Sequence, residues 1–315
     1  MKQIPDKPRL WHEKRFYSLD SYLKTTYGEK VYKLSLNAGM TCPNRDGSLD
    51  TRGCIFCSAG GSGDFAQDKT LSITQQIEEG KKLTAAKYRG HLFIAYFQAY
   101  TNTYAPVSYL REVFLEAIRH PDIVLLSIAT RPDCLNDEIV ELLCELQKIK
   151  PVWIELGLQT IHEQTASFIR RGYPLSCFTQ AVHRLQHCKI PVIAHVILGL
   201  PGESREQMLA TVDYIAGLHL FGIKLQLLHI LKGTDLAFIY QKNPFSLLTF
   251  EEYITLITNI IKRLPETIVI HRLTGDGPRN LLIAPSWSAD KKKVLNAIHK
   301  KLKDTNTWQG KEHLI

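Results

Sequence analysis

The stretch PVIAHVILGLPG, residues 191–202, is followed after Glu203 by SREQMLATVDYIAGLH, residues 204–219. The first part is short, apolar and rich in β-branched residues, which is typical of a buried strand. The second part repeats apolar residues at three- and four-residue spacing, which is typical of an amphipathic helix. Ser204, with Glu203 and Glu206 on its two sides, predicts where that helix starts. The stretch therefore predicts one strand–loop–helix unit.

The same unit recurs along most of the chain. Apolar, β-branched runs occupy residues 31–39, 91–100, 122–131, 152–160, 191–202 and 222–233, with helical patterns between them. Asn136, placed before Asp137 and Glu138, predicts another helix start. Six alternations with mostly apolar strands predict an α/β fold with a parallel sheet. Periodicity alone is compatible both with an open doubly wound sheet and with a barrel.

The domain organisation follows from where this alternation begins and ends. We predict a basic N-terminal extension at residues 1–30, a core at 31–240 and a C-terminal extension at 241–315. Within that last part we expect a helix near 249–263, a strand at 267–273, a turn at 274–280 and a basic terminal helix.

Composition narrows the class of protein. The chain has 315 residues and a 44% hydrophobic share, which is enough for a sizeable core. It has no apolar run long enough for a membrane span, and its first residues lack the apolar segment of a secretory signal. Seven cysteines, an odd number, favour a reducing compartment, where clustered cysteines more often bind metals than form disulfides. We therefore expect a cytoplasmic protein without a membrane partner.

The positive charge lies at the two ends of the chain. The formal net charge is +8, of which residues 1–33 contribute +4 and residues 291–315 contribute +5, so the remainder is −1. A lysine-rich helix such as KKKVLNAIHKKLK can simply be a solvated face. Two basic ends on a nearly neutral body, however, favour an extended polyanion such as RNA over a small anionic substrate.

Three cysteines follow the first predicted strand. Cys42, Cys54 and Cys57 have the spacing C-x11-C-x2-C in a polar, glycine-containing loop. Function gathers at the carboxyl ends of parallel strands, so this loop is expected on the functional edge of the sheet. A structural zinc site needs a fourth donor, and neither His12 nor His91 has a convincing ligand spacing. An iron–sulfur cubane with three thiolates keeps one iron open for another ligand.

This loop, with Phe56 just before Cys57, resembles the cluster motif of the radical S-adenosylmethionine (radical SAM) superfamily. The commonest spacing in that superfamily is C-x3-C-x2-C, and the longer first interval resembles the Elp3-like branch. Further resemblance comes, in order along the chain, from YFQAYTNTYAP (96–106), TRPDC (130–134), ELGLQT (155–160), RRGYP (170–174), HVILGLPGES (195–204) and LLHILKGTDL (227–236). Together with IHRLTGDGPRNLLIAPSW (270–287), these segments are most similar to the compact YhcC/YtqA group, also called MnmL-like.

The resemblance implies a partial (β/α)6 radical SAM barrel that binds one [4Fe–4S] cluster and S-adenosyl-L-methionine (SAM). Cys42, Cys54 and Cys57 would hold three irons, and SAM would occupy the fourth. Reductive cleavage of SAM would give a 5′-deoxyadenosyl radical. The implied substrate is the wobble uridine of tRNA, on which 5-carboxymethylaminomethyl-(2-thio)uridine would become 5-aminomethyl-(2-thio)uridine. An electron donor such as flavodoxin or ferredoxin is expected as a second partner.

The resemblance also suggests the residues that surround SAM: Gln98, Asn102, Gln159, Arg171 and His195. The glycines of the superfamily's usual amine-binding segment are absent from 98–102, and Ala129 stands where the Elp3-like motif has Glu. Each suggested residue also has an ordinary structural interpretation. The two amides near strand ends can satisfy backbone groups, the arginine can end a helix, and the histidine can be a hydrogen-bonded core residue.

Cations near the strand exits are candidates for the carboxylate of the implied substrate: Arg131, Arg272 and Arg279. Lys291, Lys292 and Lys293 are candidates for tRNA phosphates. These six residues can equally form structural ion pairs or a solvated face. Two other functions stay open at this stage. One is a radical SAM enzyme that acts on a small metabolite or a porphyrin-like molecule, and the other is a non-catalytic iron–sulfur or zinc protein that binds RNA.

Overall fold

A computed structural model of the chain describes residues 8–61, 63–88, 90–275 and 277–313. The chain divides into two compact units. We call the unit formed by Leu23–Leu158 and Ile169–Ile193 the cysteine unit. We call the unit formed by Met1–Tyr22, Gln159–Phe168 and Ala194–Ile315 the carboxyl-terminal unit. The predicted boundaries at 30/31 and 240/241 stay predictions. Residues 1–7 of the predicted basic extension and Asp276 of the predicted turn lie outside the described residues.

The strands form a seven-stranded sheet in the order β1-β2-β3-β4-β5-β6-β8, beside a two-stranded sheet of β7 and β9. In the cysteine unit the strands are β1 (Tyr32–Leu36), β2 (Phe93–Phe97), β3 (Ile123–Thr130) and β4 (Val152–Gln159). Each is parallel to the next, with Ser35 opposite Tyr96 and Tyr96 opposite Ser127. The helices are α2 (Ile73–Thr84), α3 (Val107–Arg119), α4 (Asp137–Gln147) and α6 (Leu175–His187), with the short 3-10 turn η1 (Pro132–Cys134).

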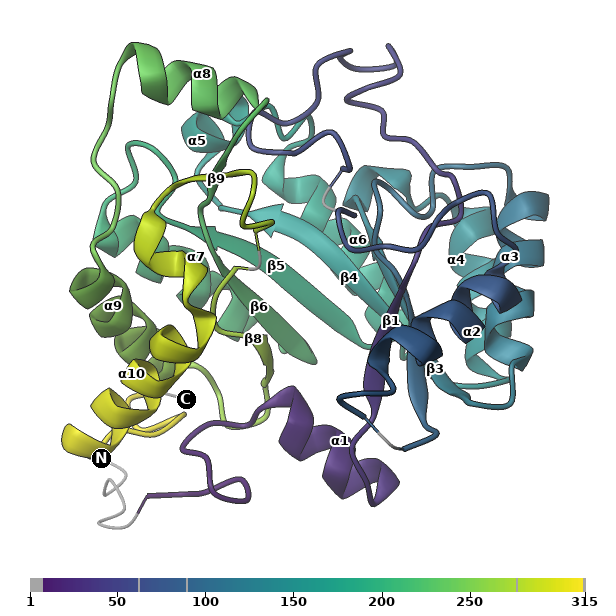
Figure 1. The fold of residues 1–315 in the computed structure, drawn as a ribbon, viewed down its shortest axis with the longest axis horizontal. Helices are drawn as coiled ribbons and strands as arrows, with labels where there is room; N and C mark the ends of the chain where they lie inside the picture. The colour runs from purple at the N-terminus through teal and green to yellow at the C-terminus, as the bar shows by residue number, and fades with distance from the viewer. Residues whose placement is uncertain (1–7, 62, 89, 276, 314–315) are drawn as a thin grey trace. The chain divides into compact units, whose positions relative to one another are not determined.

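The two faces of β1 to β4 differ in chemistry. One face packs against helices: the ring of Phe97 meets that of Phe114 on α3 edge-on, with centroids 5.0 Å apart. Helices α2, α3 and α4 lie side by side over this face (Figure 1). The opposite face carries Lys33, Tyr96, Ser127 and Glu155, because side chains alternate along a strand. A polar, partly charged sheet face is thus placed beneath the loops that leave the strands.

The carboxyl-terminal unit contains the other strands and helices. The strands are β5 (Val192–Leu198, which the unit enters at Ala194), β6 (Gly222–Leu227), β7 (Ile230–Leu231), β8 (Val269–Arg272) and β9 (Leu282–Ala284). The helices are α5 (Glu163–Phe168), α7 (Arg205–Gly217), α8 (Asp235–Lys242), α9 (Phe250–Arg263) and α10 (Lys291–Asp304), with the 3-10 turn η2 (Ser286–Ala289). Strand β8 is parallel to β6, and β7 is antiparallel to β9. Helix α1 (Leu19–Tyr27) begins in this unit and ends in the cysteine unit.

The α/β fold class with a parallel sheet is confirmed. The predicted helix starts are also present: Asn136 Oδ1 accepts from the Ile139 amide at 2.9 Å, and Ser204 forms a capping box with Gln207. The structure adds detail that periodicity did not give. The strand predicted at 267–273 is β8, the seventh strand of the sheet, and the run at 222–233 is broken into β6 and β7. No helix in the described part of the chain is long and apolar enough to cross a membrane.

Candidate active site

The cysteine loop leaves the carboxyl end of β1 and is folded back on itself at its base. The carbonyl oxygen of Cys42 accepts from the amide of Arg45 at 2.7 Å, and the carbonyl oxygen of Asn44 accepts from the amide of Gly53 at 2.6 Å. Gly53 has a φ of +77°, and a Cβ there would lie 2.8 Å from Arg45 Nε, so a side chain does not fit. When the closed excursion 45–52 is set aside, the spacing reduces to C-x3-C-x2-C. The long interval therefore brings Cys42 and Cys54 together across its base.

Donors and cations surround Cys54. The Asn44 Nδ2 atom lies 3.3 Å from Cys54 Sγ, which also lies 3.4 Å from the carbonyl oxygen of Arg170. A hydrogen bond from Cys57 lowers the pKa of Cys54 to about 7, with further lowering by Asn44 and the positive charges of Arg131 and Arg45. All three loop cysteines are half-exposed. The environment therefore favours a thiolate, the form in which cysteine binds a metal.

The segment after β2 passes next to this loop. Tyr100, at a φ of +59°, packs against Gly61, and its hydroxyl donates to the carbonyl oxygen of Ala59 at 2.6 Å. The guanidinium carbon of Arg45 lies over the Tyr100 ring, 5.7 Å from the ring centroid. A non-glycine residue held at positive φ is strained, and such strain is often found at functional sites. Gln98, half-buried, accepts from the hydroxyl of Ser35 at 3.1 Å.

Asn102 is completely buried, and its two polar atoms differ. Its Nδ2 donates to the carbonyl oxygens of Phe97 at 3.1 Å and Ala129 at 2.8 Å, both at strand ends. Its Oδ1 has no hydrogen-bond partner. A buried acceptor without a donor is uncommon in folded proteins. The ammonium group of SAM is a donor of the kind that this atom lacks.

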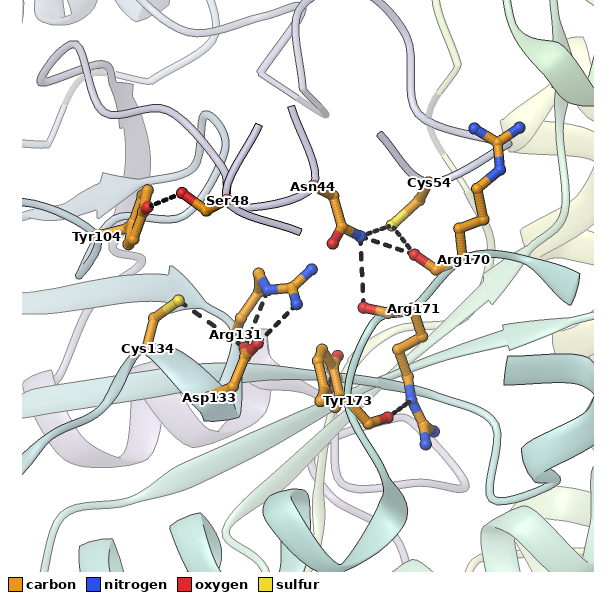
Figure 2. Close-up of polar contacts among 11 residues, drawn as sticks. Asn44, Ser48, Cys54, Tyr104, Arg131, Asp133, Cys134, Arg170, Arg171 and Tyr173 are labelled. Carbon is orange, nitrogen blue, oxygen red and sulfur yellow. Dashed lines mark hydrogen bonds and ion pairs between the residues drawn. The ribbon is translucent and has the colours of Figure 1, made fainter. Parts of the chain in front are cut away.

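The exit of β3 carries a charged pair. The Arg131 guanidinium forms a two-point ion pair with Asp133, with N–O distances of 2.9 and 2.7 Å. Its positive charge also interacts electrostatically with Cys42 and Cys54. Figure 2 shows this pair beside Cys134. Burial raises the pKa of Cys134 to about 12, with a further rise from Asp133, so this thiol stays protonated.

The turn at residues 169–174 completes the site in the cysteine unit. Arg171, of which only 2% is exposed, donates Nε to the carbonyl oxygen of Tyr173 at 2.9 Å and Nη1 to that of Leu158 at 3.2 Å. The guanidinium carbons of Arg131 and Arg171 lie 4.8 and 5.0 Å from the centroid of the Tyr173 ring. The Tyr173 hydroxyl donates to the carbonyl oxygen of Gly157 at 2.7 Å. This turn is thus rigidly attached to the end of β4.

The donor set fits an iron–sulfur cluster better than a single zinc ion. In the described part of the chain, the group of three metal-ligand side chains whose atoms all lie within 4.8 Å of one another is Glu78, His120 and Asp122. The three loop cysteines do not form such a group. Two ligands of one zinc ion lie at most about 4.6 Å apart, because each Zn–S bond is about 2.3 Å. At least one pair of the three loop sulfurs is therefore farther apart than two ligands of a single zinc ion.

The other predicted residues lie in the carboxyl-terminal unit. Gln159 ends β4 at a φ of +61°, and His195 is the one half-exposed residue of β5, whose other residues are buried. Arg272 is the last residue of β8, and Arg279 is exposed and donates Nη2 to the carbonyl oxygen of Ala289 at 3.1 Å. The exposed residues at the start of α10 are Lys291, Lys292 and Lys293. The roles assigned to all these residues stay predictions.

Sequence reasoning missed three features of the site. Asn44 lies two residues after Cys42, and no motif in the sequence singles it out. Tyr173 lies in the quoted RRGYP segment, but nothing in the sequence shows that two guanidinium groups flank its ring. The pair formed by Lys33 and Glu155, at 2.8 Å, joins strands 122 residues apart in sequence and has no local signature.

Comparison with known proteins identifies the family. The Radical SAM superfamily pattern matches residues 51–215, and the Radical_SAM C-terminal domain pattern matches residues 221–304. The chain is 44% identical to the YtqA protein of Bacillus subtilis (strain 168) over 299 residues, which cover 95% of this chain and 93% of that one. It is 37% identical to the YhcC protein of Escherichia coli (strain K12) over 266 residues, 84% of this chain and 85% of that one.

More distant matches agree with this assignment. The tRNA uridine(34) acetyltransferase of Methanocaldococcus infernus is 25% identical over 168 residues, which cover 51% of this chain and 30% of that one. The solved structure of the Elp3 protein from the same archaeon has a TM-score of 0.65 at 17% identity, covering 89% of this chain and 64% of that one. It supports the fold. The family uses a [4Fe–4S] cluster and SAM. The chain therefore belongs to the radical SAM superfamily of enzymes, in its Elp3-like branch.

Proposed function

We propose that this enzyme modifies the wobble uridine of tRNA, converting 5-carboxymethylaminomethyl-(2-thio)uridine to 5-aminomethyl-(2-thio)uridine. A relative named for an action on tRNA uridine 34 is 25% identical over 168 residues, about half of this chain. We also propose that the protein acts in the cytoplasm and receives electrons from a flavodoxin or ferredoxin.

The observation that carries the RNA part of the proposal is the meeting of the two basic ends in the carboxyl-terminal unit. The Tyr17 amide donates to Gln309 Oε1 at 2.8 Å, and the Gln309 amide donates to the carbonyl oxygen of Arg15 at 2.9 Å. Phe16 stacks on His299 of α10 with ring centroids 5.4 Å apart. Within this unit, the described N-terminal residues 8–22 hold three cations against two acids and so add a net charge of +1 beside the lysines of α10.

Helix α10 presents most of this charge to solvent. Val294, Ile298 and Leu302 are completely buried, and the helix packs against α9. Its six lysines are all exposed, at positions 291, 292, 293, 300, 301 and 303. Within the described residues, Lys300 pairs with Asp304, whereas Lys292, Lys301 and Lys303 form no ion pair. Burial lowers the pKa of His299, and the charges of Lys14 and Lys303 lower it further, as expected in a positive field.

The reaction needs a cation for the substrate carboxylate. When bound, the cluster and SAM supply a radical that abstracts hydrogen, and the side-chain N–CH2–COO⁻ offers a methylene activated by both neighbours. Removal of one hydrogen atom by that radical, followed by loss of one electron to a one-electron acceptor such as the oxidised cluster, would give an imine. Hydrolysis of its C=N bond by water would release glyoxylate and the aminomethyl product. Arg279 is exposed and has donors beyond the one given to Ala289, while Arg131 is already paired with Asp133. We therefore rank Arg279 above Arg131 as the carboxylate ligand.

The test of RNA binding is a salt titration of tRNA affinity. Replacing the three lysines at 291–293 with Gln should weaken binding and reduce the slope of log K against log salt by up to about 3, roughly one for each lost phosphate contact. A matched control replaces three exposed lysines of the cysteine unit, Lys69, Lys82 and Lys87, with Gln. If both triple variants bind alike, the tract is an ordinary solvated face.

The test of the reaction compares tRNA nucleosides from cells with and without the gene. Loss of the gene should deplete the 5-aminomethyl uridine and accumulate its carboxymethylaminomethyl precursor. An unchanged nucleoside profile would refute the proposed substrate.

A further inference from the structure

The side-chain amide of Asn44 lies between a cluster cysteine and the turn at 169–174. Its Nδ2 atom is 3.3 Å from Cys54 Sγ, 2.7 Å from the carbonyl oxygen of Arg170 and 3.4 Å from that of Arg171. Figure 2 shows the three contacts converging on this one nitrogen. The orientation of the amide follows from its neighbours, because a flipped amide would direct its oxygen at two carbonyl oxygens.

The rest of the side chain fits closely. Only 2% of Asn44 is exposed. A Cβ built on Gly172, which has a φ of +83°, would lie 2.7 Å from Asn44 Oδ1, so this glycine leaves the space that the amide fills. The Asn44 main chain also accepts from Gly53, the residue before Cys54. Packing against Gly172 and the main-chain hydrogen bond from Gly53 therefore both hold the Asn44 amide next to the sulfur of Cys54.

We propose that Asn44 donates a hydrogen bond to the Cys54 thiolate of the bound cluster and thereby raises the reduction potential of that cluster. The inference rests on Cys54 being a cluster ligand and is independent of the tRNA substrate. Hydrogen bonds to the sulfurs are among the features that set the potentials of iron–sulfur clusters. An added electron increases the negative charge on the sulfurs, so the bond is stronger in the reduced state. In this buried place its effect is little screened.

The charged side chains near Cys54 already have other partners, so the hydrogen bond to its sulfur comes from the Asn44 amide. Asp133 already forms a two-point ion pair with the Arg131 guanidinium. Arg45 directs Nη2 to the carbonyl oxygens of Cys57 and Ser58, at 3.2 and 2.7 Å. Asn44 is a neutral side chain whose N–H group lies within hydrogen-bond distance of a loop cysteine. It stabilises negative charge on sulfur without adding a fixed charge.

The experiment measures the potential of the reconstituted cluster by redox titration followed by electron paramagnetic resonance. Asn44→Ala removes the donor, and Asn44→Asp keeps the shape but presents a carboxylate. At a fixed ambient potential we expect the oxidised-to-reduced ratio to rise about tenfold in Asn44→Ala, which is about 59 mV for a one-electron couple. The rise should be larger in Asn44→Asp. Asn136→Ala removes a helix cap of α4 with no contact to a loop cysteine, and its potential should match that of the unmodified protein.

A second measurement does not depend on the variants holding a cluster. In the unmodified protein labelled with ¹⁵N in asparagine side chains, pulsed resonance of the reduced cluster should show a weakly coupled nitrogen. Absence of that coupling overturns the proposal. So does a potential that is the same in the unmodified protein and in both Asn44 variants. If Asn44 only held the loop in place, the variants would change in iron content and thermal stability. Their reduction potentials would then not fall in the order unmodified protein, Asn44→Ala, Asn44→Asp.

Discussion

The ion pair on the polar face of the sheet gives a quantitative prediction. Glu155 on β4 is 1% exposed and accepts from Lys33 Nζ at 2.8 Å and from Ser127 Oγ at 2.7 Å. Lys33 also lies over the Tyr96 ring, with Nζ 4.5 Å from the centroid. Replacing Lys33 with Ala leaves a buried carboxylate without this cation, so the folded state should lose stability.

The expected size follows from burial. Removing one partner of a buried pair costs about 3–5 kcal/mol. The Lys33 side chain is 21% exposed, so water offsets part of the loss and we take the lower end, about 3 kcal/mol. For a chain of 315 residues, with an unfolding entropy of about 2.1 cal/mol/K per residue, that corresponds to a decrease in Tm of roughly 4–5 °C.

The assay is thermal unfolding of Lys33→Ala beside a matched Lys82→Ala control. Lys82 pairs with Glu79 at 2.7 Å, but these side chains are 70% and 48% exposed, so the control should lose little stability. The double variant Lys33→Met/Glu155→Gln should recover much of the loss, because it removes the buried charge together with its partner. Equal Tm values for the two single Lys→Ala variants would refute the reasoning.

Three further predictions concern ionisable side chains. Single replacement of each loop cysteine with Ala should abolish iron binding and SAM cleavage, while Cys144→Ala should preserve both; a retained cluster would exclude that residue as a ligand. Hydrogen bonds from Lys81 lower the pKa of Asp122 and Glu78, so their contribution is present above about pH 4 and lost as pH falls through the lowered values. The Tm difference between the unmodified protein and Lys81→Met should therefore narrow in acid, and a constant difference would contradict this. Because the pKa of Cys134 is raised to about 12, its alkylation at pH 8 should be slow in the folded protein and rapid after denaturation; fast labelling of the folded protein would contradict its burial.

Periodicity predicted the strands and most helices because those segments bury one continuous face. The run at 152–160 is β4 almost to the residue, and its burial makes it nearly all apolar. Helix α5 ends at Phe168, and Arg170 takes a positive φ of 56°. In the cysteine unit, Asn44 Nδ2 donates to the carbonyl oxygen of Arg170, and no local sequence pattern contains that information.

The three cysteines of the candidate site could be singled out from the sequence as predicted ligands, whereas their surroundings could not. Three cysteines in one polar loop can be recognised from their spacing in the sequence alone. Residues 45–52 concealed their proximity, because this segment is closed by backbone hydrogen bonds such as those from Arg45 to Cys42 and from Gly53 to Asn44, which spacing does not reveal. The Lys33–Glu155 pair and the two arginines at Tyr173 arise from strand register and turn geometry, which a single sequence does not specify.

The most direct measurement of the proposed reaction uses tRNA that carries a deuterated methylene in the carboxymethylaminomethyl group. The purified protein with its cluster, SAM and a reductant should convert this nucleoside to 5-aminomethyl uridine, and deuterium should appear in 5′-deoxyadenosine. Conversion without deuterium in 5′-deoxyadenosine would contradict abstraction at that carbon, and SAM cleavage without any change in the nucleoside would contradict the substrate itself.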